Sequence, residues 1–149
     1  AIFESCKIKK KIIEKDEKEK NLRKVLNFGH TFAHAYEASL GYSKKLNHGE
    51  AVILGINSAL KFSTRNRLLK KKEYANINNH LRKFDLPSDI KKFFSKKDLN
   101  KIINFMIVDK KNITRKINII TLKKIGNVNI NNQLTIDQVK RFILSELLK

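Results

Sequence analysis

The spacing of apolar residues along the chain predicts a mainly helical protein. Four segments repeat their apolar residues at helical intervals: residues 1 to about 15, about 22–40, about 50–69 and 71–84. Gly41 follows the second segment and Pro87 lies beyond the fourth, both in positions typical of a helix end. Ser88 or Ser95 can cap short helices that extend to about Val108.

The pattern changes after the predicted helices. Residues 116–122 are rich in β-branched side chains, residues 128–130 alternate, and Gly126-Asn127 lies between the two stretches. A last helix then opens near Thr135 and Asp137 and extends through Leu148. We therefore predict a mainly α fold with a small β-hairpin near residues 115–130, in which residues 1–149 form a single domain.

Length and composition fit one globular domain that is part of a longer protein. The chain has 149 residues, of which 41% are hydrophobic, enough for a core. No apolar run approaches the roughly 18 residues of a membrane helix, and no signal-peptide pattern opens the chain. Cys6 is the single cysteine, which excludes an internal disulfide and favours the cytoplasm. Helical spacing begins at Ile2 without a cap, so we expect a missing N-terminal part.

The strong positive charge permits a nucleic-acid partner but does not favour one. Lys and Arg number 33 against 14 Asp and Glu, a net charge of +19. The basic residues are mostly lysines spread along the chain, only six are arginines, and aromatic residues do not alternate with the basic runs. We interpret the charge as solvated lysine-rich faces and expect no nucleic acid and no membrane as partner. A basic helical domain that binds nucleic acid remains the alternative, and the same field would attract a small anionic substrate.

Three of the four histidines lie within a short stretch and suggest a metal site. His30 and His34 are four residues apart, so they share one face of a helix, and His48 lies just before the next predicted helix. Antiparallel packing of the two helices would bring His48 beside His30, where neutral imidazoles could bind zinc. Histidines at this spacing are more often surface or capping residues. Glu37 and Glu50 are the nearby carboxylates, and Glu37 could accept a hydrogen bond from a ligating ring.

The same predicted helix carries a polar stripe. Arg23, Asn27, His30 and His34 follow one another at helical spacing, which indicates either a solvated face or the wall of a pocket for an anionic substrate. Arg23 could bind a carboxylate or phosphate through two parallel hydrogen bonds. Further along, Asp109-Lys110-Lys111 forms a charged segment before the hairpin, which by its local pattern is typical of a solvated turn.

Taken together, these motifs resemble one family in chain order. The longest matching segment is Leu22–Glu37, LRKVLNFGHTFAHAYE. Shorter matching segments lie at Ser5–Lys9, Asp16–Glu19, Gly41–Tyr42, His48–Val52, Gly55–Ile56, Asp109–Lys111 and Ile125–Gly126. This combination resembles the 3-dehydroquinate synthase family, strongly between residues 5 and 56 and weakly between about 66 and 104.

The resemblance implies the helical C-terminal domain of the dehydroquinate synthase-like fold, with the N-terminal NAD-binding domain absent from this chain. It implies a cytoplasmic homodimer of the shikimate pathway that needs NAD⁺ and Zn²⁺ or Co²⁺. The implied reaction converts an anionic sugar phosphate, 3-deoxy-D-arabino-heptulosonate 7-phosphate, to 3-dehydroquinate and phosphate, and this chain alone is expected to be inactive. Another sugar-phosphate cyclase, or a metal-dependent alcohol dehydrogenase of the same superfamily, remains the alternative.

The resemblance also implies roles for individual residues. His30 and His48 match the two metal-ligating histidines of the family, whose ligating glutamate would precede residue 1. His34 matches a position that could relay a proton. The other matched positions contact substrate or lie in the same site: Lys9, Glu19, Arg23, Asn27 and one of Lys110 and Lys111.

Overall fold

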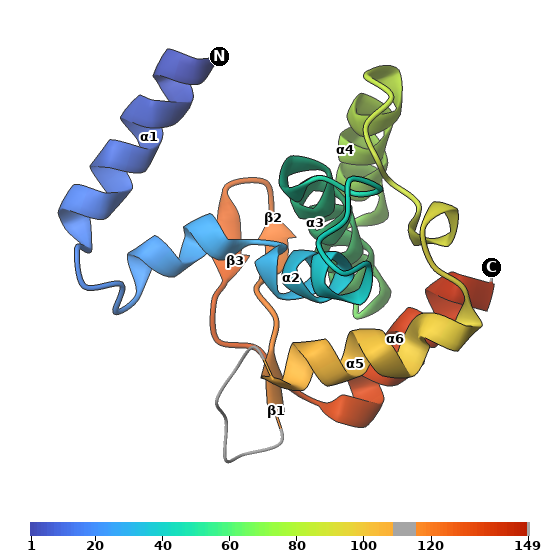
Figure 1. The fold of residues 1–149 in the computed structure, drawn as a ribbon. Coiled ribbons are helices and arrows are strands. Elements are labelled where there is room, and N and C mark those ends of the chain that lie inside the picture. The colour runs from blue at the N-terminus through green and yellow to red at the C-terminus, as the bar shows by residue number, and fades with distance from the viewer. Residues whose placement is uncertain (109–115, 149) are drawn as a thin grey trace.

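The computed structural model describes residues 1–108 and 116–148, in which helices form the body of the protein (Figure 1). The α-helices are α1 (Ile2–Lys15), α2 (His30–Ser39), α3 (His48–Arg65), α4 (Lys71–Lys83), α5 (Leu99–Val108) and α6 (Ile136–Leu148). Short 3₁₀ helices lie at η1 (Leu22–Asn27), η2 (Ile90–Lys92) and η3 (Lys96–Asp98). The prediction of a mainly α fold is therefore confirmed. Helix α3, expected at about residues 50–69, begins two residues earlier and ends four residues earlier.

Two small antiparallel sheets accompany the helices. Strand β2 (Thr121–Lys124) pairs with β3 (Asn127–Asn129), which confirms the predicted hairpin. Strand β1 (Lys116–Asn118) instead pairs with β4 (Gln133–Thr135), a strand that the sequence pattern did not reveal. Three residues are too few for a visible alternation, so β4 is recognisable only through its pairing.

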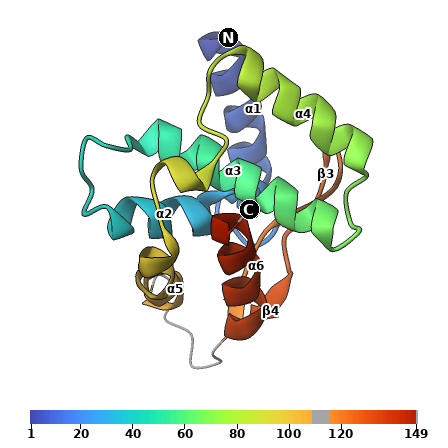
Figure 2. The ribbon, with the colours of Figure 1, turned by 90° about the vertical axis from the view of Figure 1, so that its right-hand side faces the viewer.

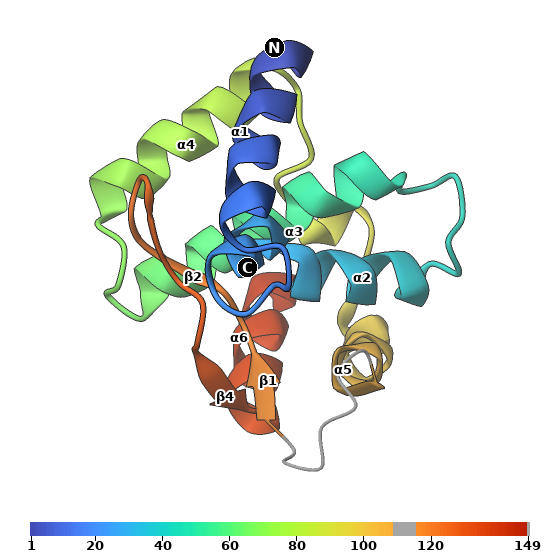
Figure 3. The same cartoon turned by 90° about the vertical axis from the view of Figure 1, so that its left-hand side faces the viewer.

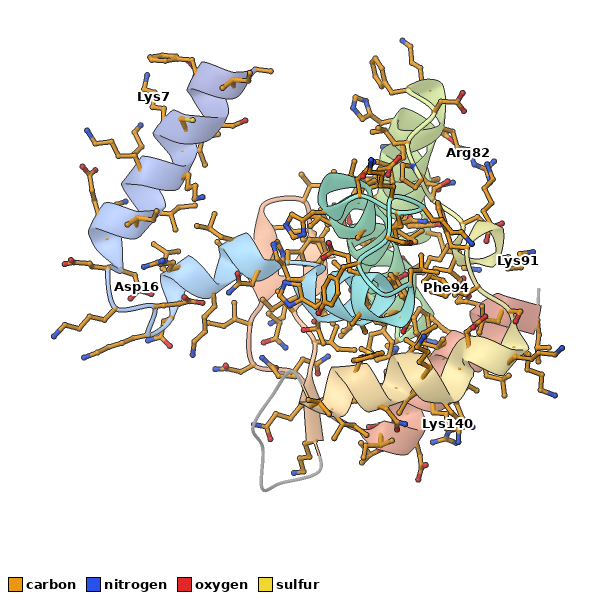
Figure 4. The ribbon with its side chains drawn as sticks, in the orientation of Figure 1. Lys7, Asp16, Arg82, Lys91, Phe94 and Lys140 are labelled. Atoms are coloured by element: carbon orange, nitrogen blue, oxygen red, sulfur yellow. The ribbon has the colours of Figure 1, made fainter. Side chains whose placement is uncertain are left out.

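The core lies around the pair α2 and α3, which pack side by side and are joined at one end by the loop of residues 40–47 (Figures 2 and 3). Helix α5 packs on α2, and α6 packs on α5. The large side chains of this core are buried: Phe32, Tyr36, Leu54, Phe62, Ile102, Met106 and Phe142. Phe94, labelled in Figure 4, extends the core from the segment before α5, with its ring 5.3 Å from that of Tyr36.

A backbone contact between two glycines fixes how α3 crosses the start of α2. A Cβ atom on Gly55 would lie 2.4 Å from the carbonyl oxygen of Gly29 and 2.8 Å from the backbone nitrogen of Ala33. A Cβ atom on Gly29 would in turn lie 2.5 Å from the backbone nitrogen of Ile56. The two segments therefore touch without intervening side chains, which places the first turn of α2 directly against α3.

The expected continuous helix over residues 22–40 is wrong. The structure has η1, a break at Phe28–Gly29, and then α2. Gly29 has φ +83°, a left-handed conformation that interrupts a right-handed helix and that glycine adopts without steric cost. The stripe Arg23–Asn27–His30–His34 is thus built from two helical segments that meet at this glycine.

Helix α1 projects from the body of the molecule (Figure 1). None of its residues is buried, and Ile2, Phe3 and Ile8 are exposed. Among the described residues, no helix combines the length and the apolar character needed to cross a membrane.

Candidate functional site

Three histidine rings lie close together across the α2–α3 pair. His30 and His48 are the first residues of these two helices, and their ring centroids lie 6.3 Å apart with the planes at 66°. The ring of His34, one turn further along α2, lies edge-on to His30 at 5.5 Å. Leu46 is buried just before His48 and anchors the end of the loop. The packing that the sequence suggested thus brings His48 beside His30.

The δ nitrogens of the two facing rings point at oxygen atoms. His30 Nδ1 lies 3.4 Å from the carbonyl oxygen of Phe28, and His48 Nδ1 lies 2.9 Å from Oε2 of Glu37. Burial lowers the pKa of His30, the hydrogen bond with the Phe28 carbonyl opposes this, and the neighbouring rings of His34 and His48 lower it further. The net shift favours the neutral form of His30, the form in which an imidazole binds a metal.

The histidine pair fits two ligands of a zinc or cobalt ion. A zinc–nitrogen bond of about 2.0–2.1 Å lets two rings share one ion at centroid distances up to about 6 Å. The observed 6.3 Å is longer than that, so the two rings would have to move closer to share an ion, and His48, which is 63% exposed, is the ring that could turn. Within the described ranges, no three His, Cys, Asp or Glu side chains are grouped to hold a metal. His30 and His48 would hold the ion together with a ligand from elsewhere.

Two adjoining cavities open beside the histidines. One of about 290 Å³ and one of about 360 Å³ share Glu19, Asn27 and His30 in their walls. The predicted site residues that line one or both are Lys9, Glu19, Arg23, Asn27, His30 and His34. Lys110 and Lys111 lie outside the described residues. The structure thus places every other predicted substrate-contacting residue in the walls of two adjoining cavities that meet at His30, whereas His48 lines neither.

The sequence interpretation missed part of the cavity wall. Thr31 and Asn118 both line the smaller cavity, and Thr31 Oγ1 donates a hydrogen bond to the carbonyl oxygen of Asn118 at 3.2 Å. Asn118 is in β1, and its amide also bonds the backbone of Ile130 and Asn132. No local pattern relates residues 31 and 118, so their meeting is a result of tertiary packing.

The turn between α1 and η1 is organised by one carboxylate, that of Asp16 (Figure 4). It accepts hydrogen bonds from the backbone N–H groups of Lys20 at 2.9 Å, Asn21 at 2.8 Å and Arg23 at 3.0 Å. The bond from Arg23, then those from Asn21 and Lys20, lower the pKa of Asp16. Asp16 therefore fixes the backbone that carries Glu19 and Arg23.

Within that turn the candidate substrate-binding side chains contact one another. Arg23 Nη1 donates to the carbonyl oxygen of Glu17 at 2.7 Å, and Arg23 Nε lies 3.9 Å from Oε2 of Glu19. Asn27 Nδ2 donates to Oε1 of Glu19 at 2.7 Å. Glu19 thus orients the amide of Asn27 and faces the guanidinium of Arg23. The remaining N–H groups of these two side chains can bind an anion or a hydroxyl.

Asp16→Ala is expected to remove hydrogen-exchange protection from the amides of Lys20, Asn21 and Arg23. In the unchanged chain, this protection should be complete above the ordinary carboxyl pKa of 3.8 and should be lost as the pH falls through the lower pKa of folded Asp16. The measurement is amide exchange by NMR, corrected for the intrinsic effect of pH. Glu17→Ala is the matched control, because only its carbonyl is used in the turn. Equal protection in both variants would contradict the role of Asp16.

Comparison with solved structures defines the class of the fold. A 2-deoxy-scyllo-inosose synthase crystallised with carbaglucose-6-phosphate, NAD⁺ and Co²⁺ matches 85% of this chain and 36% of its own, with a TM-score of 0.69 and 23% identity. A 2-epi-5-epi-valiolone synthase from Streptomyces hygroscopicus subsp. jinggangensis 5008, with NAD⁺ and Zn²⁺ bound, matches 91% of this chain and 36% of its own, with a TM-score of 0.71 and 19% identity. The chain therefore has a fold found in these cyclases.

Sequence comparison then gives the family. The chain belongs to the 3-dehydroquinate synthase C-terminal family, whose model matches residues 1–112. The 3-dehydroquinate synthase of Pelagibacter ubique (strain HTCC1062) is 56% identical over 149 residues, all of this chain and 40% of that relative. That of Thermodesulfovibrio yellowstonii is 35% identical over 142 residues, 95% of this chain and 38% of the relative. The chain thus spans about two fifths of the length of these relatives.

Proposed function

We propose that the full-length protein containing this chain is a 3-dehydroquinate synthase. It would convert 3-deoxy-D-arabino-heptulosonate 7-phosphate to 3-dehydroquinate and phosphate in the shikimate pathway, which leads to chorismate and the aromatic amino acids. The observation that supports this most is the meeting of His30 and His48, 6.3 Å apart, beside cavities lined by Lys9, Arg23 and Asn27. Membership of the family and the names of its relatives support the same reaction.

The proposed roles follow from the chemistry of each side chain. A bound Zn²⁺ or Co²⁺ would polarise substrate hydroxyl oxygens as a Lewis acid. Lys9 and Arg23 would neutralise the substrate carboxylate and phosphate, and Asn27, oriented by Glu19, would bond a hydroxyl. His34, beside His30, would move a proton to or from the substrate. One of Lys110 and Lys111 would add a further positive charge.

Other proposals concern the protein outside this chain. NAD⁺ would bind mainly to an N-terminal domain, and the active site would lie between that domain and this chain. The crystallised cyclases with NAD⁺ bound support the dependence on NAD⁺. The N-terminal domain and a second subunit of a homodimer are the proposed protein partners. We also propose a cytoplasmic location, which the exposed free thiol of Cys6 supports. Without the N-terminal domain, this chain would be inactive.

A substrate panel tests the activity. Full-length protein with NAD⁺ and zinc is offered 3-deoxy-D-arabino-heptulosonate 7-phosphate and other sugar phosphates, and released phosphate is measured. We expect release from the first compound. Release only from another sugar phosphate would favour a different cyclase. No release, combined with tight binding of labelled DNA or RNA at near-physiological salt, would favour the nucleic-acid alternative.

Arg23→Ala is expected to weaken binding of the transition state by about 2–4 kcal/mol, because a charge that faces the anionic substrate is lost. The loss would be seen as a lower kcat/KM for this substrate. The measurement is steady-state phosphate release by the full-length protein. Arg82→Ala is the control, since Arg82 is exposed on α4 (Figure 4) and lines neither of the two cavities that contain Asn27 and His30. An unchanged kcat/KM for Arg23→Ala would contradict the proposed role.

A further inference from the structure

A shielded carboxylate faces the more exposed of the two facing histidines. The side chain of Glu37 is only 13% exposed, whereas that of His48 is 63% exposed, and Oε2 of Glu37 lies 2.9 Å from Nδ1 of His48. A carboxylate so far removed from water is costly unless it accepts a hydrogen bond. The ring of His48 is thus held at Nδ1, although most of its side chain is exposed.

The direction of this hydrogen bond follows from the chemistry of the acceptor. An ionised carboxylate can only accept, so a neutral His48 ring paired with it carries its proton on Nδ1 and its lone pair on Nε2. A free neutral imidazole in water prefers the opposite tautomer, with its proton on Nε2. The contact with Glu37 therefore selects the tautomer that an unassisted ring would populate less.

We propose that Glu37 is a positioning residue, which fixes the tautomer and the direction of the His48 ring so that Nε2 points to the metal. This inference rests on the proposed metal site. The arrangement at His30 is parallel, because its Nδ1 faces the carbonyl oxygen of Phe28 at 3.4 Å, and a carbonyl can only accept, which puts the proton on Nδ1 and the lone pair on Nε2. Both rings then offer the same nitrogen, and hydrogen-bonded partners of this kind tune the basicity of metal ligands.

The position of Glu37 in the sequence supports this role. Glu37 lies seven residues after His30, which is two turns of a helix, so both side chains are on one face of α2. Helix α2 thereby supplies one ligand itself and orients the other, which comes from α3. The tautomer of His48 thus depends on how α3 lies against α2, because that packing brings His48 to Glu37.

Three variants test the role of Glu37. Glu37→Leu removes the acceptor, and Glu37→Gln keeps an oxygen that accepts more weakly. Glu50→Gln is the matched control, because Glu50 is two residues from His48 but accepts from the backbone N–H of Asn47 at 2.8 Å instead of from the ring. His48→Ala reports separately on the metal site itself.

Two measurements separate positioning from mere stability. The tautomer of His48 is determined by NMR of the metal-free, ¹⁵N-histidine-labelled chain of 149 residues. The affinity for zinc ion alone is measured by chelator competition with the full-length protein. We expect Glu37→Leu to move the His48 proton to Nε2 and to weaken zinc binding about 10- to 100-fold. Glu37→Gln should fall between Glu37→Leu and the unchanged protein, and Glu50→Gln should leave both readings unchanged.

The inference would be overturned if zinc affinity or the His48 tautomer stayed the same in Glu37→Leu. Should that variant fail to fold, unchanged readings in Glu37→Gln would overturn it and intermediate ones would support it. A loss of zinc binding in His48→Ala with none in the Glu37 variants would refute only this inference. Unchanged zinc binding in His48→Ala would refute the proposed metal site as well.

Discussion

Full-length protein carrying His30→Ala or His48→Ala is expected to lose its zinc. Its rate of phosphate release is expected to fall at least about 100-fold. The reason is that the proposed metal ion, as a Lewis acid at this position, would supply several kcal/mol of transition-state stabilisation. The two rings come from different helices but lie 6.3 Å apart, so removing either one leaves a single imidazole ligand from this chain. Zinc content by elemental analysis and phosphate release under saturating substrate are the two measurements.

The fourth histidine provides the control for these variants. His80 is exposed on α4, and its ring is 4.9 Å from that of Phe84. His80→Ala should therefore keep both the zinc and the activity. Full zinc content in His30→Ala and His48→Ala would show that the metal is bound elsewhere, and the two rings would then be a polar contact between helices.

Gly55→Ala is expected to destabilise the chain by about 1–3 kcal/mol, the usual cost of forcing extra volume into a tightly packed contact. The added methyl would meet the carbonyl oxygen of Gly29 at 2.4 Å and the backbone nitrogen of Ala33 at 2.8 Å. Backbone atoms cannot move aside as a flexible side chain can, so α2 and α3 must separate. The free energy of unfolding in urea measures the effect.

The same substitution elsewhere in α3 provides the matched control. A Cβ atom on Gly49 would meet no heavy atom within 4 Å, so Gly49→Ala should leave stability unchanged or raise it slightly through helix propensity. Since His30 directly follows Gly29, we also expect Gly55→Ala to weaken zinc binding by the full-length protein. Equal unfolding free energies for the two variants would contradict the close contact.

Local patterns predicted most of the helical structure. Helices α1, α4 and α6 follow the expected segments closely, because their apolar spacing and end signals are carried by neighbouring residues. The sequence Gly126-Asn127 likewise indicated the β2–β3 hairpin, although Asn127 already belongs to β3. The errors arose where a distant contact decides the local backbone, as at Gly29, where contact with Ile56 accompanies the break in the predicted helix.

Residue types and short-range spacing were enough to predict the helical class, the histidine cluster and the resemblance to a family. The packing of distant segments brings His48 beside His30, turns Glu37 toward His48 and adds Asn118 to the cavity wall. These last features join residues that are far apart in the chain or on different helices. Their geometry depends on close packing, here a glycine–glycine crossing, which no periodicity along the chain encodes.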